Sequence, residues 1–389
     1  MDPKKFFTNK SMCVLPWTGF ELDPGGYVKN CIMSKEYLGN IQNTPIQQIM
    51  NGEVNLRLKD DMLNDKKPTN CSGCHMQEKN RNDLSSISSR LYYLREIGAK
   101  SDLSIYDNKK NFKLRHVDLR WTNSCNQACV YCEPMLSSKW AQELGTHISS
   151  DKKSRQDVKN FVFDNIANLQ NVYLAGGEPM LMKENLEFLQ LLKEKNPDCA
   201  IRINTNLSTT RTGVFDLVRS FKNVHWIVSI ETIEEQYEYV RYHGSWRDFV
   251  QNLNTIKQLN HKISFNMLHF ILNYDSLFDC VNYLKGIGFH DNSFIIGPLT
   301  KPDHLNILNL PDHMIDRLKK KLHLLIQGSS NGYLKNSFEN LLKYYTTTTW
   351  TKNLLEFHTQ TKIMDRRRGN DCRRAFPLLF EELDAETLE

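Results

Sequence analysis

The regular alternation of strand-like and helix-like segments after Leu114 limits the fold of this chain more than any other feature of its sequence. The helical segments have apolar residues three and four positions apart, which places them on one face of a helix. Strands that alternate with helices form a parallel sheet, and six units are too few to close an eight-stranded barrel. The pattern therefore predicts an α/β fold, a partial (β/α)6 TIM-like barrel whose site lies at the carboxyl ends of the strands. The six predicted strands are residues 114–121, 172–175, 200–204, 224–230, 263–271 and 293–296.

The length of the chain indicates further modules around this barrel, because 389 residues exceed what one hydrophobic core usually supports. Residues 1–80 contain four cysteines and are predicted to form a small cysteine-rich module. Residues 81–110 are polar, include a predicted helix that ends at Gly98, and connect this module to the barrel at residues 111–300. Residues 301–389 have apolar residues at helical spacing, which predicts a C-terminal helical extension.

The composition and the N-terminal sequence indicate the compartment. No stretch approaches the ~20 apolar residues of a membrane-spanning helix, and the first residues lack the apolar core of a secretory signal. We therefore expect a cytoplasmic protein without a membrane partner. In that reducing compartment, ten cysteines are better explained as metal ligands or reactive thiols than as disulfides. The net charge of +5 does not favour a nucleic-acid partner, and the basic run 366–368 is interpreted as the end of a helix.

Three cysteines, Cys125, Cys129 and Cys132, follow the first barrel strand with the spacing C-x3-C-x2-C. A structural zinc site takes four protein ligands, and this loop contains no histidine that could complete one. A [4Fe-4S] cluster held by three thiolates keeps one iron free to bind a small molecule, so a three-ligand loop suits this chemistry. A zinc site or free thiols remain the alternative from these residues alone.

The three-cysteine loop, with Tyr131 before its last cysteine, resembles the defining motif of the radical SAM superfamily. The second barrel strand leads into Gly176-Gly177-Glu178-Pro179, which resembles the GGEP segment of that family. The resemblance covers roughly residues 111–300. It implies that the three cysteines hold the catalytic cluster, and that Tyr131 and the GGEP segment contact S-adenosylmethionine. In that segment, backbone carbonyls and the glutamate would hold the methionine ammonium group, and glycine lets the backbone approach it.

Further contacts to the cosubstrate are implied at the ends of later strands. Ser229 and Glu231, in the fourth predicted strand, occupy the place where related enzymes use hydroxyl and carboxylate groups for the ribose. The family more often has aspartate at the last of these positions. Asn204 and Asn206, which end the third strand, are candidates for contacts to the cosubstrate or the substrate. Residues 296–298 resemble the backbone that lines the adenine.

The four N-terminal cysteines could close a tetrahedral zinc site or fully ligate an iron–sulfur cluster, and their chemistry alone leaves both open. Their spacing, Cys-x12-Gly-x4-Cys followed by C-x2-C, resembles the SPASM and twitch domains, which implies an auxiliary [4Fe-4S] cluster. Four cysteines rather than seven favour a twitch module. In well-known members this module follows the barrel, and here it precedes it. The four proposed ligands are Cys13, Cys31, Cys71 and Cys74, and the cysteines expected to be uninvolved are Cys199, Cys280 and Cys372.

The resemblance implies an enzyme that cleaves S-adenosylmethionine. A one-electron donor such as flavodoxin or ferredoxin would reduce the three-cysteine cluster, and cleavage would yield methionine and a 5'-deoxyadenosyl radical that abstracts hydrogen. A peptide or protein side chain is the leading substrate class, and a carbohydrate or another small molecule comes second. The auxiliary cluster would accept an electron from the substrate radical, which predicts an oxidative modification. Two other classes stay open: a zinc-stabilised binding or scaffold protein, and an electron-transfer protein that does not cleave S-adenosylmethionine.

Overall fold

The computed structural model describes residues 6, 8–78, 88–148, 151–330 and 332–385. The chain forms two compact units. Two short segments of unit 2 interrupt unit 1, so residues that are close in the sequence can belong to different units. Unit 1 consists of Met1–Cys125, Pro134–Asn204 and Thr210–His225, and unit 2 consists of Asn126–Glu133, Thr205–Thr209 and Trp226–Glu389.

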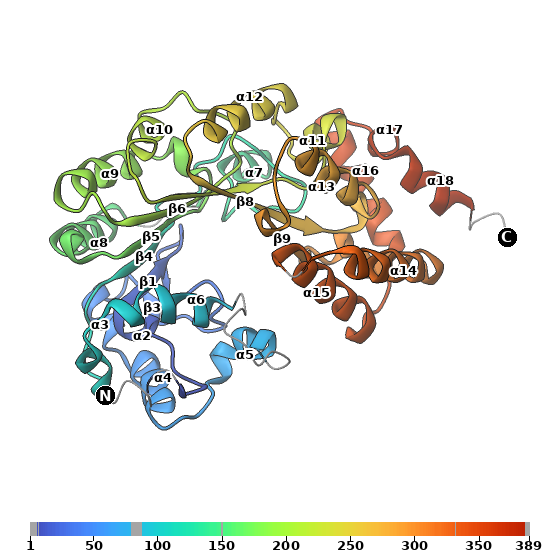
Figure 1. Cartoon of the computed structure of the whole chain (residues 1–389). Helices are drawn as coiled ribbons and strands as arrows, with labels where there is room; N and C mark the ends of the chain where they lie inside the picture. The colour runs from blue at the N-terminus through green and yellow to red at the C-terminus, as the bar shows by residue number, and fades with distance from the viewer. Residues whose placement is uncertain (1–5, 7, 79–87, 149–150, 331, 386–389) are drawn as a thin grey trace. The chain divides into compact units, whose positions relative to one another are not determined.

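A mixed sheet lies at the centre of unit 1, with the strand order β3-β2-β1-β4-β5-β6 (Figure 1). The neighbours β1 and β4, β4 and β5, and β5 and β6 are parallel. The pairs β1–β2 and β2–β3 are antiparallel. The strands are β1 (Gly19–Leu22), β2 (Tyr27–Lys29), β3 (Gly39–Asn40), β4 (His116–Leu119), β5 (Asn171–Leu174) and β6 (Ala200–Thr205).

One face of the parallel strands forms the apolar core of unit 1. Val117 and Leu119 on β4 are fully buried, as are the matching apolar residues of β5. The helices α8 (Lys152–Asp164) and α9 (Lys183–Lys195) cover this face and lie on one side of the strands in Figure 1. The ring of Phe20 on β1 packs 6.4 Å from a phenylalanine ring of α8. The predicted amphipathic helices therefore bury their apolar stripe against the sheet.

The cysteine-rich N-terminal region is mostly helical around its short strands. Its core contains the fully buried Trp17 and Tyr106, whose rings meet edge to face. The helix expected before Gly98 is α6, whose N-cap is Ser88, and residues 81–87 of the predicted connector lie outside the described residues. The helices of this region are α2 (Leu15–Thr18), α3 (Ile46–Met50), α4 (Glu53–Leu63), α5 (Ser72–Glu78) and α6 (Ser89–Glu96).

The main difference from the predicted fold concerns the strands β1, β2 and β3, because no strand is predicted before Leu114. The strand β1 pairs in parallel with β4, so the N-terminal region extends the same sheet as the barrel strands. These strands are only two to four residues long, and β1 is buried at every position. Such short segments are too brief for a periodic signal, and their pairing depends on distant residues.

Alternating strands and helices continue in the rest of the chain. In the strand order, β7 (Val224–Ser229) comes between β6 and β8 (Lys262–His269), and β8 pairs in parallel with β9 (Phe294–Pro298). Each of the six predicted strands therefore corresponds to one of β4 to β9, and the predicted α/β class with a parallel sheet is confirmed. The intervening helices are α7 (Ser138–Glu143), α10 (Gly213–Val218), α11 (Glu234–Val240), α12 (Trp246–Lys257) and α13 (Ser276–Gly286).

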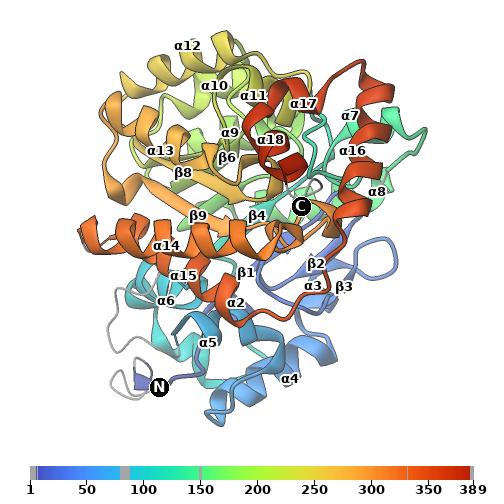
Figure 2. The same ribbon diagram turned by 90° about the vertical axis from the view of Figure 1, so that its right-hand side faces the viewer.

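The C-terminal part of unit 2 is helical, as predicted. The helix α15 packs against β9 and against α14 (Figure 2), and the hydroxyl of Ser337 on α15 accepts a hydrogen bond from the N–H of Ile296 at 3.0 Å. Three arginines end α16, and Gly369 follows in a left-handed conformation, which agrees with the predicted helix end. No helix in the described part of the chain is long and apolar enough to span a membrane. The helices are α14 (Asp312–Gly328), α15 (Tyr333–Thr347), α16 (Leu354–Arg368), α17 (Cys372–Ala375) and α18 (Pro377–Ala385).

Candidate functional site

The three-cysteine loop begins shortly after β4, and its first cysteine belongs to unit 1. The backbone N–H of Cys125 donates to the hydroxyl of Ser138 at 3.0 Å, and that hydroxyl donates to the carbonyl of Cys125 at 3.0 Å. Ser138 is the first residue of α7, and its own N–H donates to the carbonyl of Asn123. The start of α7 therefore fixes the backbone of Cys125.

The other two cysteines of the loop belong to unit 2. The N–H of Ala128 donates to the carbonyl of Tyr242 at 3.0 Å, and the N–H of Val130 donates to the carbonyl of Val240 at 2.8 Å. Both neighbours of Cys129 are therefore held by the chain around the end of α11. Burial raises the pKa of the Cys129 thiol, so its ionisation needs nearby positive charge, which a bound iron would provide.

A buried ion pair lies next to Cys129 in unit 2. Arg241 donates from Nε to Glu231 Oε2 at 3.0 Å and from Nη2 to Glu231 Oε1 at 2.8 Å. Tyr131 joins the pair, because its hydroxyl accepts from Arg241 at 2.8 Å and donates to Glu231 at 3.0 Å. A further guanidinium nitrogen, Nη1, lies 3.9 Å from the sulfur of Cys129. Two predicted cofactor-binding residues, Tyr131 and Glu231, thus belong to one network with a proposed cluster ligand.

The GGEP segment in unit 1 lies against the residues that precede Cys125. The N–H of Gly177 donates to the carbonyl of Thr122 at 3.4 Å, and the N–H of Glu178 donates to the carbonyl of Ser124 at 2.7 Å. A Cβ atom at Gly177 would lie 2.2 Å from that Ser124 oxygen, so only glycine fits. Gly176 has a φ of 110°, which also requires glycine. Glycine therefore lets this segment lie directly against the backbone of the loop, whereas its approach to the methionine ammonium group stays a prediction.

The acidic and proline residues of the GGEP segment form a tight turn. Glu178 is buried, and its carboxylate accepts from the N–H of Met180 at 3.1 Å. Pro179 begins the 3-10 turn Pro179–Leu181 that follows. One oxygen of the carboxylate thus stabilises the turn, which fixes the position of Glu178 relative to the two glycines.

The remaining predicted contacts lie at strand ends. Asn204 on β6 belongs to unit 1, and its buried Oδ1 has no hydrogen-bond partner. Asn206 belongs to unit 2, and its Nδ2 donates at 3.1 Å to Asn126, the residue that follows Cys125. Ser229 is the last residue of β7. The structure therefore brings Asn206 to the cysteine loop, whereas Asn204 lies on the sheet of unit 1.

The four N-terminal cysteines line one enclosed cavity in unit 1, together with Asn30 and Arg90. Burial raises the pKa of the Cys71 thiol to about 12 and raises the pKa values of the other three. The charge of other cysteines of the group also raises the pKa of each of these thiols except Cys74. Such an effect requires that the thiols lie close together. The sequence prediction that these cysteines form one site agrees with this arrangement.

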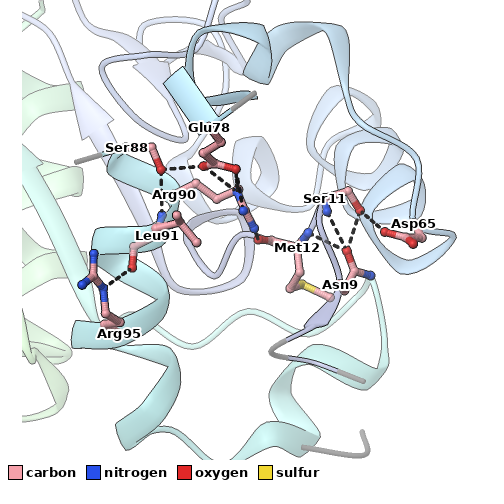
Figure 3. Close-up of polar contacts among 9 residues, drawn as sticks. All are labelled: Asn9, Ser11, Met12, Asp65, Glu78, Ser88, Arg90, Leu91 and Arg95. Atoms are coloured by element: carbon pink, nitrogen blue, oxygen red, sulfur yellow. Dashed lines mark hydrogen bonds and ion pairs between the residues drawn. The ribbon is translucent and has the colours of Figure 1, made fainter. Parts of the chain in front are cut away.

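Arg90 on α6 is fixed beside this cavity by a network that Figure 3 shows. It donates from Nη2 to the carboxylate of Glu78 at 2.6 Å and from Nη1 to the carbonyl of Met12 at 3.0 Å. Met12 directly precedes the first cysteine, and Glu78 lies four residues after Cys74. The arginine therefore ties together the two chain segments that supply the first and last thiols.

The donor sets fit two different iron–sulfur clusters. Three thiols in the loop after β4 would leave one iron without a protein ligand, whereas four thiols around a cavity can ligate every iron of a second cluster. In the described ranges, no group of three or more His, Cys, Asp and Glu side chains is arranged to hold a single metal ion. A cluster suits the four thiols because each sulfur would bind a different iron.

The other three cysteines are Cys199, Cys280 and Cys372, and all of them are buried. Burial raises the pKa of the Cys199 thiol to about 12 and raises the pKa of Cys372, which lies between Asp371 and two arginines. The proposed N-terminal ligands also have raised pKa values, so the pKa does not distinguish these three cysteines from ligands. That they take no part in either site stays a prediction.

Comparison with known families supplies the remaining evidence on identity. Residues 119–284 match the model of the radical SAM superfamily, and residues 13–75 match the SPASM model, an iron–sulfur cluster-binding domain. The chain contains a radical SAM domain. Its SPASM domain precedes the radical SAM domain, which is the order expected from the cysteine spacing. The radical SAM domain implies a [4Fe-4S] cluster with S-adenosylmethionine, and the SPASM match implies an auxiliary iron–sulfur cluster.

Two curated relatives of this radical SAM protein are GTP 3',8-cyclases. The protein from Campylobacter lari is 22% identical over 199 residues, which cover 49% of this chain and 60% of that protein. The protein from Nautilia profundicola is 27% identical over 94 residues, which cover 24% of this chain and 28% of that protein. This chain thus spans less than two thirds of the length of either relative.

The solved structures that this chain resembles include two peptide complexes. Native anSMEcpe with bound AdoMet and Kp18Cys peptide is 13% identical, with a TM-score of 0.41 over 60% of this chain and 66% of that chain. Streptococcus suis SuiB bound to precursor peptide SuiA is also 13% identical, with a TM-score of 0.41 over 83% of this chain and 73% of that chain.

Arg241 is the site residue that the sequence did not reveal. It lies in the segment Val240-Arg241-Tyr242-His243, which has no spacing that marks a radical SAM motif. Arg241 lies ten residues beyond Glu231, where the chain after α11 hydrogen-bonds to the cysteine loop. Only this contact in the folded chain shows that Arg241 belongs to the site. The sequence signal was the presence of a basic residue ten positions after Glu231.

Proposed function

We propose that this protein cleaves S-adenosylmethionine reductively at a [4Fe-4S] cluster held by Cys125, Cys129 and Cys132, and thereby abstracts hydrogen from a substrate. When bound, the cluster and S-adenosylmethionine supply a 5'-deoxyadenosyl radical, a reactivity that no side chain possesses. The observation that carries the proposal is the position of Gly177, whose backbone lies against Thr122 and Ser124, directly before the first cysteine. The proposed methionine site therefore lies beside the first proposed cluster ligand.

The residues around this site have separate roles in the proposal. The carbonyls near Gly176 and the carboxylate of Glu178 accept hydrogen bonds from the ammonium group of the cosubstrate. Tyr131 and Glu231 are held by Arg241, so a ribose contact by Glu231 has to coexist with its two bonds to the guanidinium. Ser229 and the asparagines at positions 204 and 206 supply further polar groups at the strand ends.

The auxiliary site is proposed to transfer electrons. Four thiolates leave no iron open to a substrate, so a cluster on Cys13, Cys31, Cys71 and Cys74 would exchange electrons rather than bind the reacting molecule. Removal of one electron from a substrate that has lost a hydrogen atom gives an oxidised product. We therefore propose an oxidative modification as the net reaction.

The substrate, the partner and the domain limits complete the proposal. A peptide or protein side chain is the first candidate, by the resemblance to SPASM and twitch proteins, and a small molecule is the second. The names of the curated relatives, which are cyclases of GTP, keep the second candidate open. A flavodoxin or ferredoxin in the cytoplasm is the proposed electron donor. The proposed domains are residues 1–80, 81–110, 111–300 and 301–389.

The proposal is tested by anaerobic reconstitution with iron and sulfide, followed by dithionite and S-adenosylmethionine. Release of 5'-deoxyadenosine is expected from the wild-type protein. The Cys129→Ala variant should release none and should lose about half of the bound iron, because only the auxiliary cluster remains. Cys199→Ala is the matched control, since Cys199 is buried and belongs to neither site. A wild-type protein that binds only zinc, or that forms no 5'-deoxyadenosine, contradicts the proposal.

A further inference from the structure

The second face of the parallel strands in unit 1 carries a row of polar side chains. Glu21 on β1 is in register with Asp118 on β4, Asp118 with Tyr173 on β5, and Tyr173 with Arg202 on β6. On β2, Lys29 lies opposite Glu21 and continues the row. Parallel strands in α/β proteins are usually apolar on both faces. A polar row at one register position therefore indicates that this face lines a binding site rather than a packed core.

The two faces of these strands are clearly separated. The apolar face packs against α8 and α9, whereas the polar face meets α6. Tyr93 of α6 lies 4.5 Å from the ring of His116, which precedes Asp118 by two residues on the same face of β4. The ring of Tyr92, also on α6, lies 4.6 Å from the guanidinium of Arg202. The helix α6 thus covers the amino-terminal side of the polar row.

One end of the row is acidic, and one arginine forms ion pairs with two carboxylates there. Arg120 donates to both oxygens of Asp118, at 3.1 and 3.0 Å. The same guanidinium lies 3.4 Å from one oxygen of Glu21. The other oxygen of Glu21 is buried and has no hydrogen-bond partner. This end therefore has an acceptor that a ligand could satisfy.

The other end of the row is a single arginine between two aromatic rings. The guanidinium of Arg202 lies 4.6 Å from the ring of Tyr92 and 5.2 Å from the ring of Tyr173. Its Nε is buried without a hydrogen-bond partner, and no carboxylate in the described residues forms an ion pair with it. Two residues further along the same face of β6, Asn204 has a buried Oδ1 that also lacks a partner. A cation held in this way is oriented for an anion that the protein itself does not supply.

The row also lies beside both proposed cofactor sites. A Cβ atom at Gly176, in the GGEP segment, would lie 3.1 Å from the Cβ of Arg120. At the β1 end of the row, Glu21 lies close enough to Cys31, one of the four cysteines of the auxiliary site, for its charge to raise the pKa of that thiol. A molecule bound along the row would therefore lie near the cosubstrate and near the proposed electron acceptor. A substrate needs this position, because it would react with the cosubstrate and then pass an electron to the auxiliary site.

We propose that this row is the substrate site of unit 1, and that Arg202 binds a carboxylate of a peptide substrate while Glu21 and Asn204 accept its N–H groups. This inference rests on the proposed function. A carboxylate suits the site better than a phosphate, because Arg120 is already paired with two carboxylates and Asp118 lies close enough to Arg202 to repel a dianion. The modified segment of the peptide is thus expected to contain an aspartate or a glutamate.

The test compares two blocked amino acids that differ only in charge, N-acetyl-glutamate N-methylamide and N-acetyl-glutamine N-methylamide. Their dissociation constants are measured by ligand-observed NMR on the anaerobically reconstituted protein with S-adenosylmethionine bound. The wild-type protein should bind the carboxylate probe about tenfold more tightly than the amide probe. Arg202→Met should remove this preference. The control Arg219→Met should keep it, because Arg219 also contacts a phenylalanine ring but is exposed at the C-terminal end of α10.

Several outcomes would overturn the inference. Equal binding of the two probes by the wild-type protein would do so even if Arg202→Met failed to fold, and so would a preference that survives in a folded Arg202→Met. Arg202→Lys, which keeps the charge, should retain a weaker preference for the carboxylate. Inorganic phosphate that competes with the probe more strongly than acetate would contradict the carboxylate assignment. Release of 5'-deoxyadenosine by the wild-type protein is measured separately, so a failure of the proposed function is distinguished from a failure of this inference.

Discussion

Arg241 links a buried carboxylate to a cysteine that we propose as a cluster ligand. Its side chain and that of Glu231 are almost inaccessible, with 3% and 2% of their surface exposed. Burial raises the pKa of Glu231, whereas Arg241 and Tyr131 oppose this shift through hydrogen bonds. A buried pair of this kind contributes little net stability, but loss of one partner leaves an uncompensated charge. The pair therefore fixes the position of Tyr131 and Cys129 more than it stabilises the unit.

The first prediction concerns this pair. Arg241→Met should lower the free energy of unfolding by about 3–5 kcal/mol, because Glu231 then remains buried without a partner. Adding Glu231→Gln to that variant should restore part of the loss, since the uncompensated charge is removed. Urea denaturation of the reconstituted single and double variants measures both effects. If the double variant were as unstable as the sum of the two single losses, the two side chains would not act as a pair.

The second prediction concerns Glu21, which faces Asp118, Arg120, Lys29 and Asp23. Burial raises the pKa of Glu21 from 4.5 to about 7. The folded protein therefore binds a proton that the unfolded chain releases, so stability should fall as the pH rises from about 4.5 to about 7. Glu21→Gln should raise the melting temperature at pH 8 more than at pH 5. An equal change at both values would show that Glu21 titrates normally.

At the scale of secondary-structure elements, the tight packing between the GGEP segment and the β4 loop decides which residues are tolerated. Gly177→Ala would place a methyl group 2.2 Å from the carbonyl oxygen of Ser124, so the backbone must move. We predict that the affinity for S-adenosylmethionine falls by more than about tenfold, or about 1.4 kcal/mol, in equilibrium dialysis. The control is Gly286→Ala in α13, where no atom lies within 4 Å of the added Cβ. Unchanged affinity in Gly177→Ala would contradict the proposed methionine site.

The six barrel strands and the C-terminal helices could be predicted because their apolar residues repeat with a regular period over four or more residues. The strands β2 and β3 could not, since they have only three and two residues. The strand β1 is as long as β4, but it directly follows the short helix α2 and its parallel partner lies about a hundred residues further along the chain. The polar row could not be predicted from the sequence either. Glu21, Asp118 and Arg202 are separated by about a hundred residues each, and only the register of the sheet aligns them.

For the whole molecule, cysteine spacing predicted both proposed metal sites: Cys125, Cys129 and Cys132 lie within eight residues, whereas the N-terminal group spans residues 13–74. The loop after β4 and the GGEP segment were predicted from adjacent residues, and the structure places their backbones in contact. The partners of those motifs were not predictable in the same way. Arg241 and Arg90 each join segments that are distant in the sequence, and neither lies in a recognisable pattern.

The central claim is that the three-cysteine cluster has an iron that S-adenosylmethionine can bind. Electron paramagnetic resonance of the dithionite-reduced, reconstituted protein tests this claim most directly, because a ligand on one iron changes the signal of its cluster. We predict that S-adenosylmethionine shifts part of the signal in the wild-type protein and in Cys13→Ala, and that no shift occurs in Cys129→Ala. A wild-type spectrum that is the same with and without S-adenosylmethionine would contradict the account.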